Sequence, residues 1–384
     1  MRFPFRTAVT TVLLAGPVHA ANAGSIDALN LLDNYNLITS GDTTSYSETD
    51  GNALIGGNLY GGQYNMHVIS NTISSLTVAG NVAGNVQTKG QGLNVGGSIA
   101  GSVNMNDGGN AYVGSVANGG KLNNNANGHG STYVVGDIAG NVNTNGGNTV
   151  YGGNLTGYAN ANGGGTVQHQ TVTSPFAPAT QASDAIAVLS AFSAQLSAIG
   201  ANSAYNFLDS DTVIFDAVGD SHGLAAFTID DANGFFNQAG EFQFNLASGV
   251  QTILLNVINS DIDALLNIHA NFLGGSAINL GKNILWNFQN ASKIDINAQF
   301  GGSLLALDAD VITRGNIEGT LVAKSLIQGQ EIHYQGLYAD ADDFPVPQNT
   351  PISSTVPLPG TVPLLAIGFA GLGAVYRRNR QATA

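Results

Sequence analysis

The sequence predicts a mainly β protein: a right-handed β-solenoid that is discontinuous along the chain, with one long helix packed alongside it. Three features predict this fold class. A short glycine-containing triplet recurs through the first half of the chain, apolar residues alternate with small or polar ones around each copy, and the triplet returns after a long interruption. Recurrence at a regular spacing indicates stacked repeats, and alternation indicates strands with one buried side.

The recurring triplet consists of glycine, a small polar residue and an apolar residue. Its successive glycines lie 23, 17, 17, 22 and 17 residues apart. A unit of this length, sometimes extended at a loop, is typical of one solenoid coil. The six copies are Gly57-Asn58-Leu59, Gly80-Asn81-Val82, Gly97-Ser98-Ile99, Gly114-Ser115-Val116, Gly136-Asp137-Ile138 and Gly153-Asn154-Leu155.

Within each copy every second residue is apolar or glycine, as in Val78-Gly80-Val82-Gly84-Val86. Residues two apart share one side of a strand, so we expect this side to point inward. The Asn, Ser, Ala and Asp residues between them should face water or stack in ladders. Loops are expected at residues 104–110 and 123–130, where asparagine and glycine gather. The inner side is predicted to include Val82, Ile99, Val116, Ile138 and Leu155.

A helix is predicted near residues 184–199, because apolar residues there recur at helical spacing from Ile186 to Ile199. Ser183 is the expected N-cap and Gly200 the expected terminator. Strand-like runs return from Val213 onward, and Gly315-Asn316-Ile317-Glu318-Gly319 then repeats the early pattern. We therefore expect early and late coils to stack in one solenoid. The runs are Val213–Phe215, Phe242–Leu246, Thr252–Val257, Ile284–Phe288, Lys293–Ile296 and Ser303–Leu307.

Composition excludes several classes of protein. The chain has no cysteine, so disulfides and thiolate metal sites are impossible. It has 11 basic and 25 acidic residues, and five of the basic ones lie near the two ends. A surface this acidic, without a basic stripe, excludes nucleic acid as a partner.

Two processing segments frame the predicted domain at residues 24–345. Residues 1–23 are predicted to be a signal peptide, with Arg2 and Arg6 before an apolar stretch and Val18-His19-Ala20 as a cleavage site for signal peptidase. Residues 346–384 are predicted to be a linker and a sorting segment. Its parts are Val356-Pro357-Leu358-Pro359-Gly360, an apolar run over 361–375, and Arg377, Arg378 and Arg380.

This tail resembles PEP-CTERM sorting signals, especially the variant with a Val-Pro-Leu-Pro motif. The resemblance implies cleavage by an exosortase-type enzyme after transient insertion in the inner membrane. Leu358 stands where the main class has an acidic residue, and Gly360 follows the second proline, so the exosortase subtype stays open. An ordinary C-terminal membrane helix is the alternative.

Motifs in the same order along residues 26–340 make the chain resemble the choice-of-anchor A family. That family pairs one extracellular domain with alternative surface anchors, so the resemblance implies export and brings no catalytic residue. The matching motifs are Asn30-Leu31-Leu32, Tyr35-Asn36-Leu37-Ile38, Gly41-Asp42, Gly51-Asn52-Ala53-Leu54-Ile55-Gly56-Gly57-Asn58-Leu59, Val213-Ile214-Phe215, Ile284-Leu285-Trp286-Asn287-Phe288, Gly315-Asn316-Ile317-Glu318-Gly319 and Glu331-Ile332-His333.

We expect no catalytic, cofactor or metal site, and hence no enzyme. Few titratable residues occur in the repeats, and the histidines are dispersed. Asp220-Ser221-His222 lacks the glycines of a nucleophile elbow, and Glu331 with His333 should form a polar cap at the end of the solenoid. Calcium is a weak alternative at one group of acids, which we expect to be solvated loop carboxylates. These acids are Asp209, Asp211, Asp216, Asp220, Asp230 and Asp231.

The predicted function is structural or adhesive: an exported cell-surface or matrix protein that binds a glycan or another matrix ligand. Ice binding is an alternative, because Thr132, Thr149 and Thr166 lie 17 residues apart and could form an exposed ligand ladder. The equivalent earlier positions are expected to be Leu76, Leu93 and Asn110, which makes this row short. A polysaccharide-active enzyme is the remaining alternative.

Overall fold

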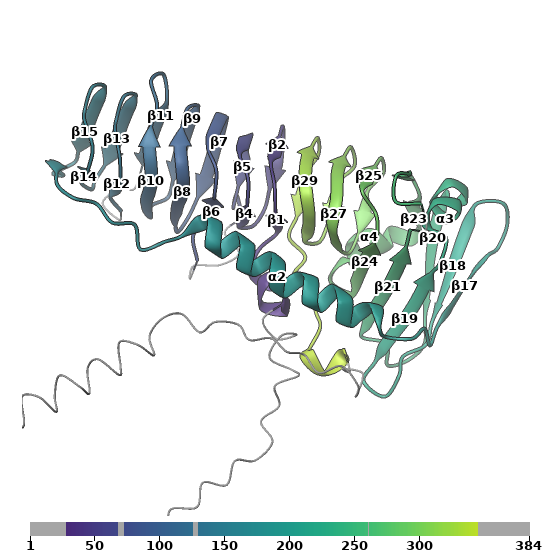
Figure 1. The fold of residues 1–384 in the computed structure, drawn as a ribbon. Coiled ribbons are helices and arrows are strands. Elements are labelled where there is room, and N and C mark those ends of the chain that lie inside the picture. The colour runs from purple at the N-terminus through teal and green to yellow at the C-terminus, as the bar shows by residue number, and fades with distance from the viewer. Residues whose placement is uncertain (1–27, 68–72, 126–129, 260, 345–384) are drawn as a thin grey trace, which may run out of the picture. The chain divides into compact units, whose positions relative to one another are not determined.

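Parallel β-strands stacked coil upon coil form most of the protein. The computed structural model describes residues 28–67, 73–125, 130–259 and 261–344 (Figure 1). Within them, 26 strands belong to one hydrogen-bonded network, and every pairing in it is parallel. The protein is therefore mainly β, as the sequence predicts. Strands at equivalent places in successive coils form three rows along the stack, which we call rows A, B and C.

Row A runs the length of the stack. In spatial order it contains β19 (Leu224–Ile229), β21 (Thr252–Ile258), β24 (Ile284–Gln289), the first part of β27 (Ser303–Thr313), the first part of β29 (Leu321–Gln328), β1 (Leu37–Thr39), β4 (Ala53–Ile55), β6 (Leu76–Val78), β8 (Gly92–Ile99), β10 (Asn110–Val116), β12 (Thr132–Val134), β14 (Thr149–Tyr151) and β16 (Val167–His169).

Rows B and C complete each coil. Row B contains β22 (Leu265–Ile268), β25 (Lys293–Ile296), the later parts of β27 and β29, β2 (Thr43–Ser45), the start of β5 (Leu59–Tyr64), the start of the strand that follows it at Val82, the ends of β8 and β10, and the bridged residues Ile138 and Leu155. Row C contains β26 (Phe300–Gly301), β28 (Ile317–Glu318), β30 (Ile332–His333), β3 (Glu48–Thr49), the end of β5, β7 (Val82–Lys89), β9 (Ser102–Asn106), β11 (Lys121–Asn125), β13 (Asn141–Asn145) and β15 (Tyr158–Asn162).

The chain enters the stack in its middle and builds it in two directions. After a helix at residues 28–34, it adds coils outward from β1 to β16. It then restarts at the opposite end and works back until β29 pairs with β1, where Leu37 contacts Leu321 on one side and Ala53 on the other. The predicted stacking of early and late coils is confirmed. β1 to β3 are therefore covered on both sides only when the late coils are in place.

Helix α2 (Pro178–Ser197) runs along row A and spans the distance between the two halves (Figure 1). Its buried Leu189, Phe192 and Leu196 pack on outward apolar side chains of row A, such as Leu254 and Leu285. This packing explains why the strands of the late half are apolar on both sides. The predicted helix alongside the coils is confirmed.

Two predictions about the helix ends are wrong. α2 begins at Pro178, with Ala177 as N-cap and no capping side chain, so Ser183 lies within the helix. Proline is well suited to a first helical position because it has no N–H to leave unpaired. The helix ends at Ser197, two residues before Ile199 and three before the expected terminator Gly200.

The repeated glycine-polar pair forms one corner of each coil. The side-chain oxygen of Asn58 accepts a hydrogen bond from the backbone N–H of Asn81 at 2.9 Å, and Asn81 accepts one from Ser98 at 2.8 Å. A Cβ at Gly97 would lie 2.6 Å from the amide oxygen of Asn81. The corner thus needs a polar side chain to cap the next coil and a glycine to let that coil approach.

The predicted inner positions are confirmed in four coils and wrong in the fifth. Val82, Ile99, Val116 and Ile138 are buried, whereas Leu155 is 39% exposed. Leu155 pairs with Ile138 on one side only, because its coil is the last described one. The predicted loops are also partly wrong, since residues 102–106 and 121–125 belong to β9 and β11.

The opposite end of the stack is capped. A four-stranded sheet of β17 (Ala204–Phe207), β18 (Thr212–Ala217), β20 (Glu241–Leu246) and β23 (Asn271–Phe272) lies there with α3 (Ala232–Gln238). Phe215, Phe235 and Phe242 pack with Trp286 in a cluster of aromatic rings. The remaining short elements are α4 (Ser276–Asn279) and the 3-10 turns η1 (Leu273–Gly275), η2 (Gly281–Asn283) and η3 (Ala341–Asp343).

Candidate functional site

Two lines of asparagine side chains cross the outer surface of row C. In β9 the buried Val103 and Met105 alternate with partly exposed residues, so Asn104 and Asn106 point away from the core. β11, β13 and β15 present asparagine at the paired positions, in register with β9. We call this surface the asparagine face. It consists of Asn104, Asn106, Asn123, Asn125, Asn143, Asn145, Asn160 and Asn162.

Amide-to-amide hydrogen bonds connect successive rungs of this face. Asn143 donates to Asn123 at 3.1 Å, and Asn123 donates to Asn104 at 2.9 Å. In the second line Asn162 donates to Asn145 at 3.0 Å, and Asn145 donates to Asn125 at 2.7 Å. Each amide is held in one orientation, and rungs repeat at the strand spacing of about 4.8 Å.

The asparagine face is regular, and its own eight residues carry no charge. Helix α2 covers row A and leaves row C to solvent. Lys121 lies at its margin at the start of β11, and Lys89 precedes Asn106 in its line. Each amide keeps further donor and acceptor capacity beyond its ladder bond. The face can therefore form many hydrogen bonds with a polar, extended and uncharged ligand.

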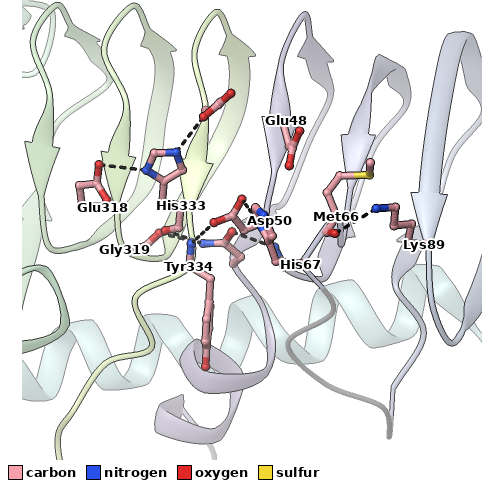
Figure 2. A network of polar contacts seen from close by, with 12 residues as sticks. Glu48, Asp50, Met66, His67, Lys89, Glu318, Gly319, His333 and Tyr334 are labelled. Atoms are coloured by element: carbon pink, nitrogen blue, oxygen red, sulfur yellow. Dashed lines mark hydrogen bonds and ion pairs between the residues drawn. The ribbon is translucent and has the colours of Figure 1, made fainter. Parts of the chain in front are cut away.

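A second polar site lies on row C where the early and late coils meet (Figure 2). His333 is hydrogen-bonded through Nδ1 to Glu318 at 3.0 Å and through Nε2 to Glu331 at 2.8 Å. Glu318 is buried and also accepts from Gln299 at 2.6 Å. Asp50 accepts from the backbone N–H of Tyr334 at 3.1 Å. Asp50 therefore joins the first coil to the last, while His333 joins the strands of the late half. The prediction that Glu331 and His333 form a polar cap at the end of the solenoid is wrong in its place, because β30 pairs with β28 on one side and with β3 on the other.

Burial alone would lower the pKa of His333, but its neighbours outweigh that effect. The hydrogen bonds of Glu331 and Glu318, with the charges of Glu318 and Asp50, raise the pKa above its ordinary value of 6.5. The imidazole is therefore protonated more readily in the folded chain than in the unfolded one. Both of its N–H groups can then donate to carboxylates.

We expect this histidine to make stability depend on pH. A raised folded-state pKa stabilises the protein fully below the unfolded pKa of 6.5, and the contribution is lost as pH rises through the folded value. Denaturant unfolding across that window should show wild type losing stability relative to His333→Gln. Parallel curves for the two proteins would contradict the expectation.

A family comparison identifies the domain. The sequence matches, at residues 28–132 and 117–334, the model of a family described as a "putative ice-binding-like adhesive domain". The chain belongs to this family. A search of curated proteins gives no match. Among solved structures, the chain is similar to the tapirin C-terminal domain of Caldicellulosiruptor kristjanssonii, with 12% identity, a TM-score of 0.29, and coverage of 81% of this chain and 95% of that one.

The threonine row predicted on this adhesive domain is not an exposed ladder. Thr132 and Thr149 are paired neighbours but fully buried, and the hydroxyl of Thr144 lies 2.8 Å from each of theirs. Thr166 is out of register, because Thr149 pairs with Val167. The equivalent earlier residue is Ala111 and not Asn110. A hydroxyl at an inward strand position is satisfied inside the core, which spacing alone does not reveal.

The acidic residues considered for calcium serve their own loops. Asp209 accepts from the backbone N–H groups of Asp211 and Thr212, Asp220 from His222 and Leu224, and Asp231 caps α3 through Gly234. Ser221 and His222 are exposed, with 3.4 Å between Oγ and Nδ1. Neither group is gathered into a site.

One other set of residues in the adhesive domain brings metal-binding atoms together. Donor atoms of Glu48, Asp50 and His67 all lie within 4.8 Å of one another, and His67 Nδ1 lies 2.7 Å from Asp50. Calcium takes six to eight oxygen ligands, so this group offers too few oxygen donors for it. Sequence reasoning missed the group because Asp50 and His67 lie on different coils.

The processing segments lie outside the described residues. These are the signal peptide at 1–23 and the sorting segment with Val356-Pro357-Leu358-Pro359-Gly360 and its arginines. Of the described helices, none is long and apolar enough to cross a membrane. The resemblances to choice-of-anchor A proteins and to PEP-CTERM signals stay predictions.

Proposed function

We propose that this protein is an exported cell-surface or matrix adhesin that binds an extracellular glycan through the asparagine face. The observation that carries the proposal is the pair of in-register amide lines on an uncovered, uncharged surface. We also propose that the stacked coils are a right-handed β-solenoid. The parallel pairing of coils 17 residues apart supports this architecture.

The chemistry of the asparagine face favours an uncharged polysaccharide over other ligands. Amides both donate and accept hydrogen bonds, as sugar hydroxyls do. Because the ladder fixes their orientation, binding costs less side-chain entropy than it would with free amides. An extended polysaccharide could also contact several rungs at once, which raises its affinity. The net charge of −14 disfavours anionic polymers.

We expect the variant Asn104→Ala, Asn123→Ala, Asn143→Ala to lose at least about tenfold in glycan affinity, since three contacts worth about 0.5–1.5 kcal/mol each are removed. A glycan array, followed by titration of the best ligand, provides the measurement. Asn233→Ala with Asn237→Ala is the matched control, because this exposed pair on α3 forms the same amide bond at 3.1 Å. Equal affinity of both variants for the glycan would contradict the proposal.

Ice binding is the alternative function, and an ice-recrystallisation assay tests it. Thr132 and Thr149 of the threonine row on which it was predicted are buried, and Thr166 is out of register with them, so we expect no inhibition of ice recrystallisation.

We also propose that the chain is not an enzyme. Purified protein should show no hydrolase or lyase activity on polysaccharides, with or without calcium. Turnover that depends on an aspartate between 209 and 231 would contradict this.

We propose that signal peptidase and an exosortase process the two ends. An apolar segment of about 15 residues spans roughly 22 Å as a helix, less than the ~30 Å hydrocarbon core, which favours a temporary stay in the membrane. The arginines would remain inside, which places Pro357 and Pro359 at the outer boundary. Prolines there keep the backbone extended for a protease.

Mass spectrometry of protein from the native host tests this processing. We expect the mature surface form to lack about 25 C-terminal residues, because the motif lies that far from the end. Pro357→Ala with Pro359→Ala should leave an uncleaved form in the inner membrane. Intact Arg380 in the surface form would instead indicate a permanent anchor.

A further inference from the structure

The end of the stack formed by β14, β15 and β16 is open. Among the described residues β15 pairs only with β13, and β16 only with β14. One edge of each strand therefore presents backbone N–H and C=O groups without a strand partner. Three large side chains are exposed at this end: Leu155 at 39%, Tyr158 at 54% and Val167 at 42%. An open edge of this kind is a template for another strand.

The side-chain ladders also stop here without a capping group. Asn160, in register with Asn143, donates sideways to Asn162 within its own strand at 3.0 Å. Gln168 donates to Thr166 two residues away at 2.6 Å. The side-chain oxygens of Asn162 and Thr166 thus accept hydrogen bonds from their own strands. The equivalent oxygens of Asn145 and Asn148, one coil earlier, accept from the following coil. A further strand of matching chemistry would extend the ladders.

Charge distinguishes this end from the rest of the molecule. No Asp, Glu, Lys or Arg occurs between Asp137 and Asp184, although the chain has a net charge of −14. Proteins usually protect an open edge with lysine or proline, and β15 contains neither. The occupant must itself avoid charge repulsion with an acidic protein. A second copy of the same uncharged end meets this condition, and the ladders supply its matching chemistry.

We propose that two copies of this chain associate end to end through this edge, with β15 pairing antiparallel to β15 of the second copy. A two-fold axis perpendicular to row C reverses the strand direction and places Asn160 at the centre. Tyr158 of each copy then lies opposite Asn162 of the other. The two asparagine faces become one continuous surface, although the association does not depend on what that surface binds.

The assembly closes at two copies. At the other end of the stack, the backbone N–H groups of Asn202 and Ser203 bond to the Ala226 carbonyl at the edge of β19, and α3 packs on β22. Among the described residues β17 pairs only with β18, so its outer edge is a single antiparallel strand and not an equivalent row of edges for head-to-tail growth. An isologous contact at the open end uses that edge in both copies. A dimer is therefore expected, and a fibre is not.

Sedimentation velocity of the full chain over a range of concentrations tests the proposal. Wild type should be dimeric. Tyr158→Lys with Asn162→Lys places like charges opposite each other and should give a monomer, with unchanged circular dichroism because both residues are exposed. Tyr158→Lys with Asn162→Glu places lysine opposite glutamate and should restore the dimer. The control Leu265→Lys, 50% exposed in β22, should stay dimeric.

Each contrary result overturns part of the proposal. A monomeric wild type at about 100 μM, or a lysine–lysine variant that still associates, would show that the open end is not the interface. Association of the lysine–lysine variant is also what would be observed if the C-terminal segment, and not the open end, held two copies together. A monomeric lysine–glutamate variant would rule out the antiparallel pairing centred on Asn160.

Discussion

Ile138→Asp should unfold the whole stack. Ile138 is fully buried and pairs with Val116 in the preceding coil and Leu155 in the following one. Removing its side chain costs about 2–5 kcal/mol, and the unpaired carboxylate adds a further penalty. A loss of more than about 4 kcal/mol is a large part of the 5–15 kcal/mol that stabilises a typical domain. We expect loss of the β-sheet circular dichroism signal at 25 °C.

Leu155→Asp is the matched control for that experiment. Leu155 occupies the same position in the next coil, but its exposed side chain leaves water available to a carboxylate. We expect its melting temperature to fall by a few degrees at most, consistent with about 1 kcal/mol. If Ile138→Asp melts with wild type, the core is not built as described. If both variants unfold, the burial of Ile138 is not what makes an aspartate destabilising there.

Spacing predicted the coils because each repeat is defined by its corner. The close approach of Gly97 to Asn81, and the hydrogen bond that the backbone N–H of Ser98 donates to Asn81, have counterparts in other coils and mark the sequence at intervals of 17 residues, or 22 to 23 where a loop is longer. The alternation beside the corner then determines which residues point inward. Both signals are local, so they can be read without knowing what covers the coil.

Predictions failed where the outcome depended on the neighbouring coil. Leu155 has the inward pattern, yet no described coil covers it. Thr132 and Thr149 have the spacing of a surface ladder, yet they lie inside. The asparagine face was missed because four of its asparagines, at 104, 106, 123 and 125, were assigned to loops. Asparagine at every second position, as at 143 and 145, was the signal that could have found it.

The junction between the two halves explains why motifs far apart in sequence occur together. Asn36, from the early motif, is fully buried between the first coil and the last. Its Nδ2 donates to the carbonyl of Gly319 at 2.9 Å and lies 3.4 Å from that of His333. Its Oδ1 accepts from the backbone N–H of Gly51 at 3.1 Å. One amide therefore connects three separate motifs.

Asn36→Leu should release the late coils from the early ones. The substitution keeps the size of the side chain but leaves the Gly319 carbonyl and the Gly51 N–H buried without their amide partner, at about 1–3 kcal/mol each. We expect global stability to fall by about 2–5 kcal/mol. Amide hydrogen exchange should rise most in β29, β30 and β1, since they meet at this junction, and least in β11 and β13.

Asn34→Leu provides the comparison two residues earlier. Among the described residues, its amide bonds only to the carbonyl of Asn30, at 2.7 Å in an exposed part of the helix at residues 28–34. We expect a change in stability of no more than about 0.5 kcal/mol, because water can replace that bond. If the two leucine variants have the same exchange pattern, the buried amide does not hold the halves together. Equal acceleration of exchange in all coils would instead mean that the junction opens only when the whole stack unfolds, and is no weaker than any other pair of coils.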